Sequence, residues 1–277
     1  AMSGKPRLRT ALLYAALTLV AVIVLLPFVW VLFGAFKTQG EIMAAPGAWL
    51  PQDFSNLANF AELFERRQFG TYMGNSLIVS AFTVASNVLF SSLAGYALAK
   101  LPFKGSKLVF GCILAAMMIP YIALFVPQFF IIVQFGLVNT LAGIILPIAV
   151  MPIAVFIMRQ FADSVPDELL EAARLDGAGE FRIFFGIFLP LVGPAIATVA
   201  IITFLNSWNY FLWPLIVAQD QGTYTLPVGL AVASQAARSI DYGLLLAGAI
   251  VVLLPVLILF LFLQKYFVRG VAVTGLK

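Results

Sequence analysis

Six long apolar stretches without a single Asp, Glu, Lys or Arg most strongly restrict what this chain can fold into. They are Ala11–Phe36, Tyr72–Ala99, Leu108–Gln134, Leu141–Met158, Ile183–Ala218 and Tyr242–Leu263. A helix needs about 20 apolar residues to cross the roughly 30 Å of hydrocarbon in a bilayer. Continuous apolar runs indicate helices, because the strands of a membrane barrel alternate apolar and polar residues. The sequence therefore predicts an all-α, polytopic membrane protein with six transmembrane helices.

The overall composition excludes several classes of protein. Hydrophobic residues make up 62% of the 277 residues and charged residues only 10%, whereas a soluble domain carries roughly 25% charged residues. A cytosolic enzyme, a disordered protein and a nucleic-acid-binding module are therefore excluded. The chain has no histidine, and its one cysteine, Cys112, lies in an apolar stretch. We therefore predict no metal site, no disulfide and no catalytic residue.

The positions of the prolines predict that some spans are bent. Pro190 and Pro194 lie near the start of the fifth stretch, which is longer than a span requires. They are expected to kink that helix, because proline removes a backbone hydrogen bond and clashes with the preceding turn. Pro120, Pro127 and Pro255 are expected to bend the third and sixth spans. The first stretch is too long for a signal-peptide core and predicts an uncleaved span.

The distribution of Lys and Arg predicts the orientation in the membrane. With the N-terminus in the cytoplasm, one side carries twelve of these residues and the other carries four, namely Lys37, Arg66, Arg67 and Arg238. Basic residues favour the cytoplasmic side, so both termini are predicted to be cytoplasmic. The predicted organisation is an N-terminal segment (1–10), a transmembrane domain (11–266) with one distinctive cytoplasmic loop (159–182), and a C-terminal tail (267–277).

The cytoplasmic loop Arg159–Arg182 contains six of the 12 acidic residues. Ser164 precedes Asp167 by three residues, which predicts a capping box at the start of a helix. Arg174 lies near the negative end of that helix, and Gly177 is placed to end it. The pattern alone leaves two interpretations open. The helix is a solvated connector on the lipid headgroups, or its small residues allow close approach of another protein surface.

A longer motif resembles a known family. It comprises Glu171-Ala172-Ala173, three residues, Gly177, nine residues, Ile187, one residue and Leu189-Pro190. This resembles the EAA motif of permease subunits of bacterial ABC importers, and EAARLDGAG is similar to the carbohydrate-uptake, MalG-like branch. Further similar positions are Asn75-Ser76, Asn139, Ile144-Ile145-Leu146-Pro147 and Trp208-Asn209. The resemblance covers nearly the whole chain and implies a MetI/MalG-like permease fold.

The resemblance also implies partners and a location. A coupling element that docks on a cytoplasmic ATPase subunit is implied for Glu171, Ala172, Ala173, Asp176 and Gly177. The implied assembly contains a homologous second permease, an ATPase dimer and an extracytoplasmic substrate-binding protein, in a bacterial or archaeal plasma (inner) membrane. The chain lacks a GxxxxGK[ST] phosphate loop. We therefore expect no cofactor on this chain, with ATP and Mg bound by the ATPase subunits, and no nucleic acid.

Polar side chains in the fifth stretch are candidates for the substrate pathway. Asn206, Asn209, Tyr210 and Trp213 recur at the spacing of one helix face. Amides bond sugar hydroxyls and aromatic rings stack on sugar C–H faces, which suits a neutral sugar. Alternatively, the asparagines bond neighbouring helices and the rings anchor at the interface. For Asn87, Gln128 and Gln134 a packing role is favoured.

The outer loop Gln219–Asp241 is where the resemblance implies contact with a substrate-binding protein. The candidates are Leu226, Pro227, Val228 and Gly229, a segment that is apolar for an exposed loop. The same residues can instead pack against the outer ends of this chain's own helices. Both interpretations stand on the sequence alone.

The function predicted is that of a non-enzymatic permease subunit in an ATP-driven importer for a sugar or sugar-like solute. The alternative is a stand-alone secondary carrier or facilitator for a small polar solute. Spans without charged residues disfavour ion-coupled transport, because pumps keep such residues for their relays. A polytopic membrane enzyme is disfavoured, since the chain has no histidine and no intramembrane acid.

Overall fold

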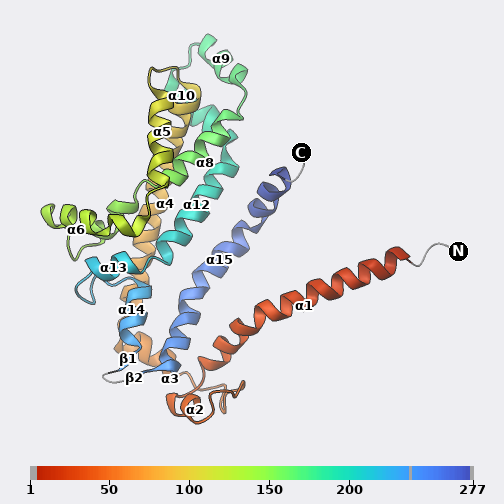
Figure 1. Ribbon diagram of the computed structural model, residues 1–277, viewed down its shortest axis with the longest axis vertical. Coiled ribbons are helices and arrows are strands. Elements are labelled where there is room, and N and C mark those ends of the chain that lie inside the picture. The colour runs from red at the N-terminus through yellow and green to blue at the C-terminus, as the bar shows by residue number, and fades with distance from the viewer. Residues whose placement is uncertain (1–4, 237–238, 275–277) are drawn as a thin grey trace. The chain divides into compact units, whose positions relative to one another are not determined.

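The computed structural model describes residues 5–236 and 239–274, and these are helical almost throughout (Figure 1). The longer helices are α1 (Lys5–Gly34), α4 (Phe69–Lys100), α5 (Ser106–Met117), α6 (Phe125–Gln134), α8 (Pro152–Asp163), α9 (Asp167–Leu175), α12 (Gly193–Trp208), α14 (Leu226–Ala233) and α15 (Tyr242–Thr274). The shorter ones are α2 (Gln39–Ala44), α3 (Ala58–Ala61), η1 (Glu62–Arg66), η2 (Tyr121–Leu124), α7 (Leu141–Ile145), η3 (Leu146–Ile148), α10 (Glu180–Ile183), η4 (Phe184–Phe188), α11 (Leu189–Leu191) and α13 (Leu212–Val217). Within the described ranges, β structure is limited to β1 (Gln235–Ala236) paired antiparallel with β2 (Ser239–Ile240). The predicted all-α class is confirmed.

The helices provide up to six membrane spans, as the sequence predicts. Three are unbroken: Arg9–Gly34 within α1, α4 itself and Tyr242–Phe262 within α15. The other three are bent pairs of helices. Ser106–Met117 and Tyr121–Gln134 meet at 98°, Leu141–Ile148 and Pro152–Asp163 at 44°, and Glu180–Leu191 and Gly193–Trp208 at 78°. The third, fourth and fifth apolar stretches are therefore broken.

Prolines lie at these breaks. Pro120 separates α5 from η2, and Pro190 and Pro194 flank the break between α11 and α12. The bends expected at these prolines are confirmed. Pro127, by contrast, is the third residue of α6. Backbone N–H groups in the first turn of a helix have no acceptor within that helix, so the missing N–H of proline removes no hydrogen bond there. Pro255 lies inside α15, which continues through it.

The ends of the predicted transmembrane domain are helical rather than irregular. α1 begins at Lys5, within the predicted N-terminal segment. α15 continues to Thr274, so the described part of the predicted tail 267–277 extends the sixth helix. Residues 1–4 and 275–277 lie outside the described residues.

The chain divides into two compact units. The first contains the residues up to Phe69 together with Leu230–Pro255. Within it, the side-chain amide of Asn59 donates to the backbone carbonyls of Ala35 and Lys37, each at 2.8 Å. Gln39 accepts from the backbone N–H of Tyr242 at 2.8 Å. These bonds attach α3 to the residues that follow α1, and α2 to the start of α15.

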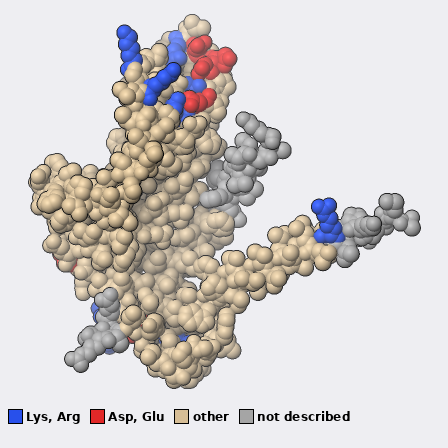
Figure 2. Space-filling model, viewed as in Figure 1, with Lys and Arg blue, Asp and Glu red and all other residues tan. Residues whose placement is uncertain are grey.

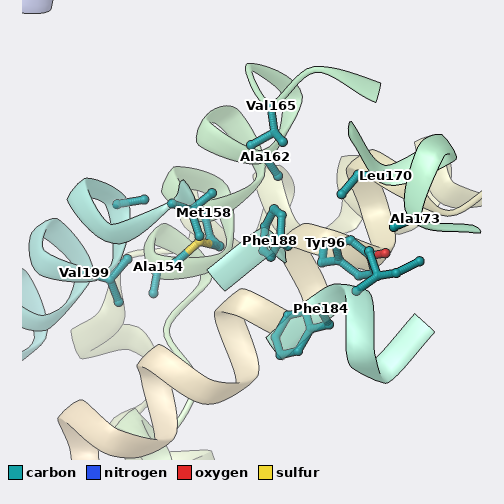
Figure 3. Close-up of a cluster of buried hydrophobic side chains, with 13 residues drawn as sticks. Tyr96, Ala154, Met158, Ala162, Val165, Leu170, Ala173, Phe184, Phe188 and Val199 are labelled. Atoms are coloured by element: carbon teal, nitrogen blue, oxygen red, sulfur yellow. The ribbon is translucent and has the colours of Figure 1, made fainter. Parts of the chain in front are cut away.

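The second unit contains Gly70–Gly229 and the residues from Val256. An apolar cluster in this unit joins α4, α8, α9, η4 and α12, as Figure 3 shows. Tyr96 of α4 stands among the aromatic side chains, with its ring centre 4.8 Å from that of Phe188 and 5.5 Å from that of Phe184. Met158 of α8 is fully buried beside them. This cluster fixes α9 on the rest of the unit.

Asn87 connects the unbroken span α4 to the broken fourth span. Its buried side chain donates to the carbonyl of Ile148 at 2.8 Å and accepts from the N–H of Met151 at 2.7 Å. Both backbone groups lie at the break between η3 and α8, where helical partners are missing. The packing role favoured for Asn87 from the sequence is therefore what the structure shows. In hydrocarbon, a broken helix is tolerated only when such groups are satisfied again.

Replacing Asn87 by leucine is expected to destabilise the protein. A buried carbonyl and a partly buried N–H lose their partners, and the buried group alone costs about 1–3 kcal/mol. The measurement is thermal unfolding of the purified protein in mild detergent. Asn209→Leu, which removes an exposed amide, serves as the matched control. Equal melting temperatures for the two variants would contradict the bridging role of Asn87.

Candidate functional site

The helix carrying the EAA motif is α9, which lies at one end of the second unit (Figure 1). Asp167 and Glu168 occupy its first turn and Arg174 its last. These charges complement the helix dipole, whose positive end is at the N-terminus. Figure 2 shows acidic side chains gathered in this region with basic ones beside them. The element is therefore a charged surface helix, as predicted.

The predicted capping box at Ser164 is wrong. Ser164 follows the last residue of α8, and its hydroxyl donates to the carbonyl of Phe161 at 2.7 Å. The N-cap of α9 is Pro166, whose side chain accepts no hydrogen bond. Proline disfavours the helical conformation of the residue before it, Val165. α9 therefore starts only at Asp167, beyond the reach of Ser164.

The predicted C-terminal stop at Gly177 is confirmed. Gly177 has a φ of +79°, in the left-handed region that favours glycine. Its N–H donates to the carbonyl of Arg174, and the N–H of Ala178 donates to the carbonyl of Ala173, both at 3.0 Å. These two bonds form a complete Schellman motif. The chain then turns sharply into α10.

α9 has a buried face and an exposed face. Leu170 and Ala173 are buried and point toward Tyr96 and Phe188 (Figure 3). The exposed side chains include Leu169, Glu171, Ala172, Leu175 and Asp176. Leu175 is 89% exposed, which is unusual for a large apolar side chain on a stable helix. Of the predicted coupling residues, Ala173 therefore anchors the helix internally, while the others face outward.

Polar contacts attach both ends of α9 to its surroundings. Lys100 Nζ donates to Asp167 Oδ1 at 2.6 Å. Arg174 Nε donates to Glu180 Oε1 at 2.7 Å, and the hydroxyl of Tyr96 donates to Glu180 Oε2 at 2.6 Å. The bond to Glu180 raises the pKa of Arg174 above its usual value. Sequence reasoning missed these contacts, because Tyr96 and Glu180 are 84 residues apart.

A cavity of about 480 Å³ lies at the breaks of the third and fourth spans, beside the C-terminal end of α12. Its lining includes Met117, Tyr121, Pro147, Met151, Asn206 and Tyr210. Among the described residues that line it, no Asp, Glu, Lys or Arg occurs. The breaks thus create an uncharged chamber with a few polar groups.

Two of the four predicted pathway residues line this cavity. Asn206 is exposed to it, and its amide nitrogen donates to the carbonyl of Ile202 at 2.9 Å. The hydroxyl of Tyr210 is hydrogen-bonded to that of Tyr121 across the cavity lining. The side chains of Asn206, Tyr121 and Tyr210 therefore form the polar part of the cavity wall.

The other two predicted pathway residues lie elsewhere. Asn209 is exposed and bonds the carbonyl of Leu205 at 2.8 Å. Trp213 is fully buried, and its indole N–H donates to the carbonyl of Gly143 at 3.1 Å. The prediction of one continuous helix face is wrong because α12 ends at Trp208 and α13 begins a new helix. Trp213 therefore has a packing role, whereas the sequence suggested either solute contact or anchoring at the membrane interface.

The residues predicted to contact a binding protein, 226–229, are mostly covered by this chain itself. Leu226, Val228 and Gly229 are buried, and Pro227 is half-buried. These residues begin α14, and the N–H of Leu226 donates to the hydroxyl of Ser76 at 2.7 Å. A Cβ atom at Gly229 would collide with the ring of Tyr72. The apolar segment therefore packs against the start of α4, which was the alternative interpretation.

An exposed turn precedes this segment and is held by two asparagines. Asn139, with a φ of +58°, accepts from the N–H of Gln219 at 2.8 Å and donates to the carboxylate of Asp220. Asn75 donates to the carbonyl of Gly222 at 2.8 Å. The bond from Asn139 lowers the pKa of Asp220. The turn 219–222 is thus an ordered, exposed surface.

Comparison with known proteins establishes the family. The family model described as "Binding-protein-dependent transport system inner membrane component" matches residues 87–273. The chain belongs to this family. It is therefore a permease subunit of an ABC importer and not an enzyme.

Full-length relatives of this permease confirm the branch that the motif predicts. The arabinooligosaccharides transport system permease protein AraQ of Halalkalibacterium halodurans is 42% identical over 96% of both chains. The diacetylchitobiose uptake system permease protein NgcG of Streptomyces coelicolor is 37% identical over 96% of this chain and 88% of its own. The trehalose/maltose transport system permease protein MalG of Thermococcus litoralis is 31% identical over 98% of both.

Solved structures confirm the permease fold. A chain of a bacterial ABC transporter that imports the acidic polysaccharide alginate matches with a TM-score of 0.82 at 22% identity, over 96% of this chain and 99% of its own. A second alginate transporter structure, in complex with a periplasmic protein bound to an alginate pentasaccharide, matches with a TM-score of 0.63 at 17% identity, over 93% and 94%. The permease is thus an integral membrane protein of the predicted MetI/MalG-like fold.

Proposed function

We propose that this permease forms half of the translocation pathway for a neutral oligosaccharide and receives its driving motion through α9. The observation that carries the proposal is the exposed, capped helix α9, whose inner face is fixed in the apolar cluster while its outer face is free of that cluster. A helix packed only against this chain's own spans needs no outward-facing Leu175 and Ala172. An interface with an ATPase subunit accounts for both.

The assembly proposed contains a homologous second permease, two ATPase subunits and a substrate-binding protein. α9 and both termini face the cytoplasm, where the excess of basic residues lies. ATP and Mg are held by the ATPase subunits. The turn 219–222, fixed by Asn139 and Asn75, is the proposed contact for the substrate-binding protein on the other side of the membrane. It replaces the buried segment 226–229 in that role.

The chamber at the helix breaks is the proposed solute-facing surface of this subunit. Its lining offers an amide at Asn206 and aromatic rings at Tyr121 and Tyr210, and it carries no charge among the described residues. Amides bond hydroxyl groups, and rings stack on the C–H faces of sugars. Two of the relatives reported above are named for neutral saccharides, arabinooligosaccharides and trehalose/maltose. A neutral sugar therefore fits the uncharged lining of the chamber and these two relatives.

Purification of the tagged permease from its native membrane tests the proposed assembly. Mass spectrometry is expected to find an ATPase subunit and a second, related permease bound to it. The complex, reconstituted in liposomes with the neighbouring binding protein, is expected to move a labelled oligosaccharide only when ATP is supplied. If the chain purified alone and moved solute without ATP, the secondary-carrier alternative would take the place of this proposal.

Substitution of the chamber residues is expected to weaken solute handling. Asn206→Ala and Tyr210→Phe each remove one hydrogen-bonding group, which contributes about 0.5–1.5 kcal/mol. We therefore expect the concentration for half-maximal uptake to rise by about two- to tenfold, with ATPase coupling preserved. Asn209→Ala, outside the chamber lining, is the matched control. Indistinguishable uptake by all three variants would remove the chamber from the pathway.

A further inference from the structure

Two residues on one face of α4 bond to opposite ends of the α9 region. Tyr96 and Lys100 are four residues apart, so they lie one above the other on the helix. Lys100 reaches the segment that leads into α9, and Tyr96 reaches the residue that pairs with its last turn. The unbroken span α4 thus holds α9 at two points that are well separated along that helix.

At the N-terminal end of α9, the attachment is a lysine removed from solvent. Lys100 Nζ donates to the carbonyl of Val165 and to Asp167 Oδ1, both at 2.6 Å. The side chain of Lys100 is only 4% exposed, whereas that of Asp167 is 71% exposed. A buried ammonium group requires partners, because burial without them is costly. Lys100 therefore interacts with the start of α9 and not with solvent.

At the C-terminal end, the attachment runs through a shared carboxylate. Glu180 accepts from Arg174 in the last turn of α9 and from Tyr96 in α4. Arg174 Nη2 adds a longer contact of 3.4 Å to the second carboxylate oxygen. Hydrogen bonds to a charged group are stronger than those between neutral groups, and they restrict the orientation of the two partners. The chain of Tyr96, Glu180 and Arg174 therefore sets the position of this end of α9.

We propose that Tyr96 and Lys100 are positioning residues that make α9 and α4 move as one body. This inference rests on the coupling role proposed for α9. Apolar contacts such as that of Leu170 with the cluster are non-directional and permit sliding. Two directional attachments at opposite ends prevent both sliding and rotation of α9 on α4. A displacement imposed on α9 by an ATPase subunit is then delivered to α4 rather than lost in local rearrangement.

The test uses Tyr96→Phe, which keeps the ring packing, and Lys100→Met, which keeps the length of the side chain. Both are reconstituted with the second permease, the ATPase and the binding protein. We expect the number of solute molecules moved per ATP hydrolysed to fall by between about twofold and thirtyfold. The matched controls Tyr14→Phe and Lys104→Met change exposed residues and are expected to keep the ratio. Lys100→Arg is expected to restore much of it.

A distance measurement separates a positioning role from a merely structural one. Spin labels are placed at Glu168 on α9 and at Phe103 just beyond α4, with the exposed Cys112 replaced by serine. With the attachments intact, we expect one narrow distance that is the same with and without ATP. In Tyr96→Phe and Lys100→Met the distribution is expected to broaden. Narrow distances and an unchanged transport ratio in both variants would overturn the inference.

The coupling role of α9 is tested in parallel with Gly177→Arg. If Gly177→Arg uncouples ATP hydrolysis from transport while Tyr96→Phe and Lys100→Met do not, only the positioning inference fails. If Gly177→Arg also leaves transport unchanged, the proposed coupling role of α9 fails. The two failures are therefore distinguishable in one set of reconstitutions.

Discussion

Replacing Gly177 by arginine is expected to abolish solute uptake while the protein remains inserted in the membrane and ATP hydrolysis continues. A residue with a Cβ atom at a φ of +79° is strained by about 1–2 kcal/mol. The strain acts on the two hydrogen bonds that close α9, those of Gly177 and Ala178. The position is exposed, with no atom near enough to clash with an added Cβ. The defect therefore lies at the end of α9 and at the surface proposed to meet the ATPase.

The measurement is uptake of labelled solute and ATP hydrolysis in the same liposomes. Gly177→Asn is the matched control, because asparagine adopts the left-handed conformation at small cost. Gly177→Ala separates backbone strain from side-chain bulk, and we expect it to fall between the other two. Near-normal uptake by Gly177→Arg would contradict the assignment of α9 as the coupling element.

Replacing Gly95 by alanine is expected to cause a large loss of stability. α4 approaches α8 so closely at this position that a Cβ would lie 2.8 Å from Met158 Cγ and 2.9 Å from the backbone nitrogen of Arg159. The methionine side chain can shift, but the backbone of α8 cannot without moving that helix. Overpacking of this kind costs about 1–3 kcal/mol. The expected result is a lower melting temperature and a lower yield of folded protein.

Gly74 provides the matched control in the same helix. A Cβ added there meets no atom within 4 Å. Gly74→Ala is therefore expected to leave stability unchanged or to raise it by roughly 0.5–1 kcal/mol, because alanine loses less backbone freedom on folding. Thermal unfolding of both variants in the same detergent makes the comparison. A Gly95→Ala protein as stable as Gly74→Ala would show that the close crossing of α4 and α8 is not required.

The parts of the fold that could be predicted from the sequence are those governed by local chemistry. Apolar stretches long enough to cross the bilayer became spans, because their length is set by the hydrocarbon thickness. The breaks near Pro120 and Pro190 follow from the missing N–H of proline. The stop at Gly177 follows from the conformational freedom of glycine. Each of these properties belongs to one residue or one stretch.

The features that could not be predicted depend on contacts between distant segments. The apolar sequence of residues 226–229 is compatible with contact with a partner protein and with packing against α4. Only their contacts with Ser76 and Tyr72 distinguish these two possibilities. The spacing of Asn206 and Trp213 would place them on one face of a continuous helix. The helix is interrupted between them, and neither residue type predicts that interruption. The attachment of α9 through Tyr96 and Lys100 joins positions more than 60 residues apart.

The unbroken length of α4 gives the second unit a lever arm. From Ser76 to Lys100 the helix rises about 36 Å, so a tilt of about 10° displaces one end by about 6 Å relative to the other. Lys100 lies at the end attached to α9, and Ser76 and Asn75 hold the outer turn and α14 at the opposite end. Because the neighbouring spans are broken and α4 is not, α4 is the span that would carry a tilt imposed at the proposed ATPase contact along its whole length. In the proposed assembly, the turn 219–222 therefore changes position with the nucleotide state of the ATPase, although the turn itself binds no nucleotide.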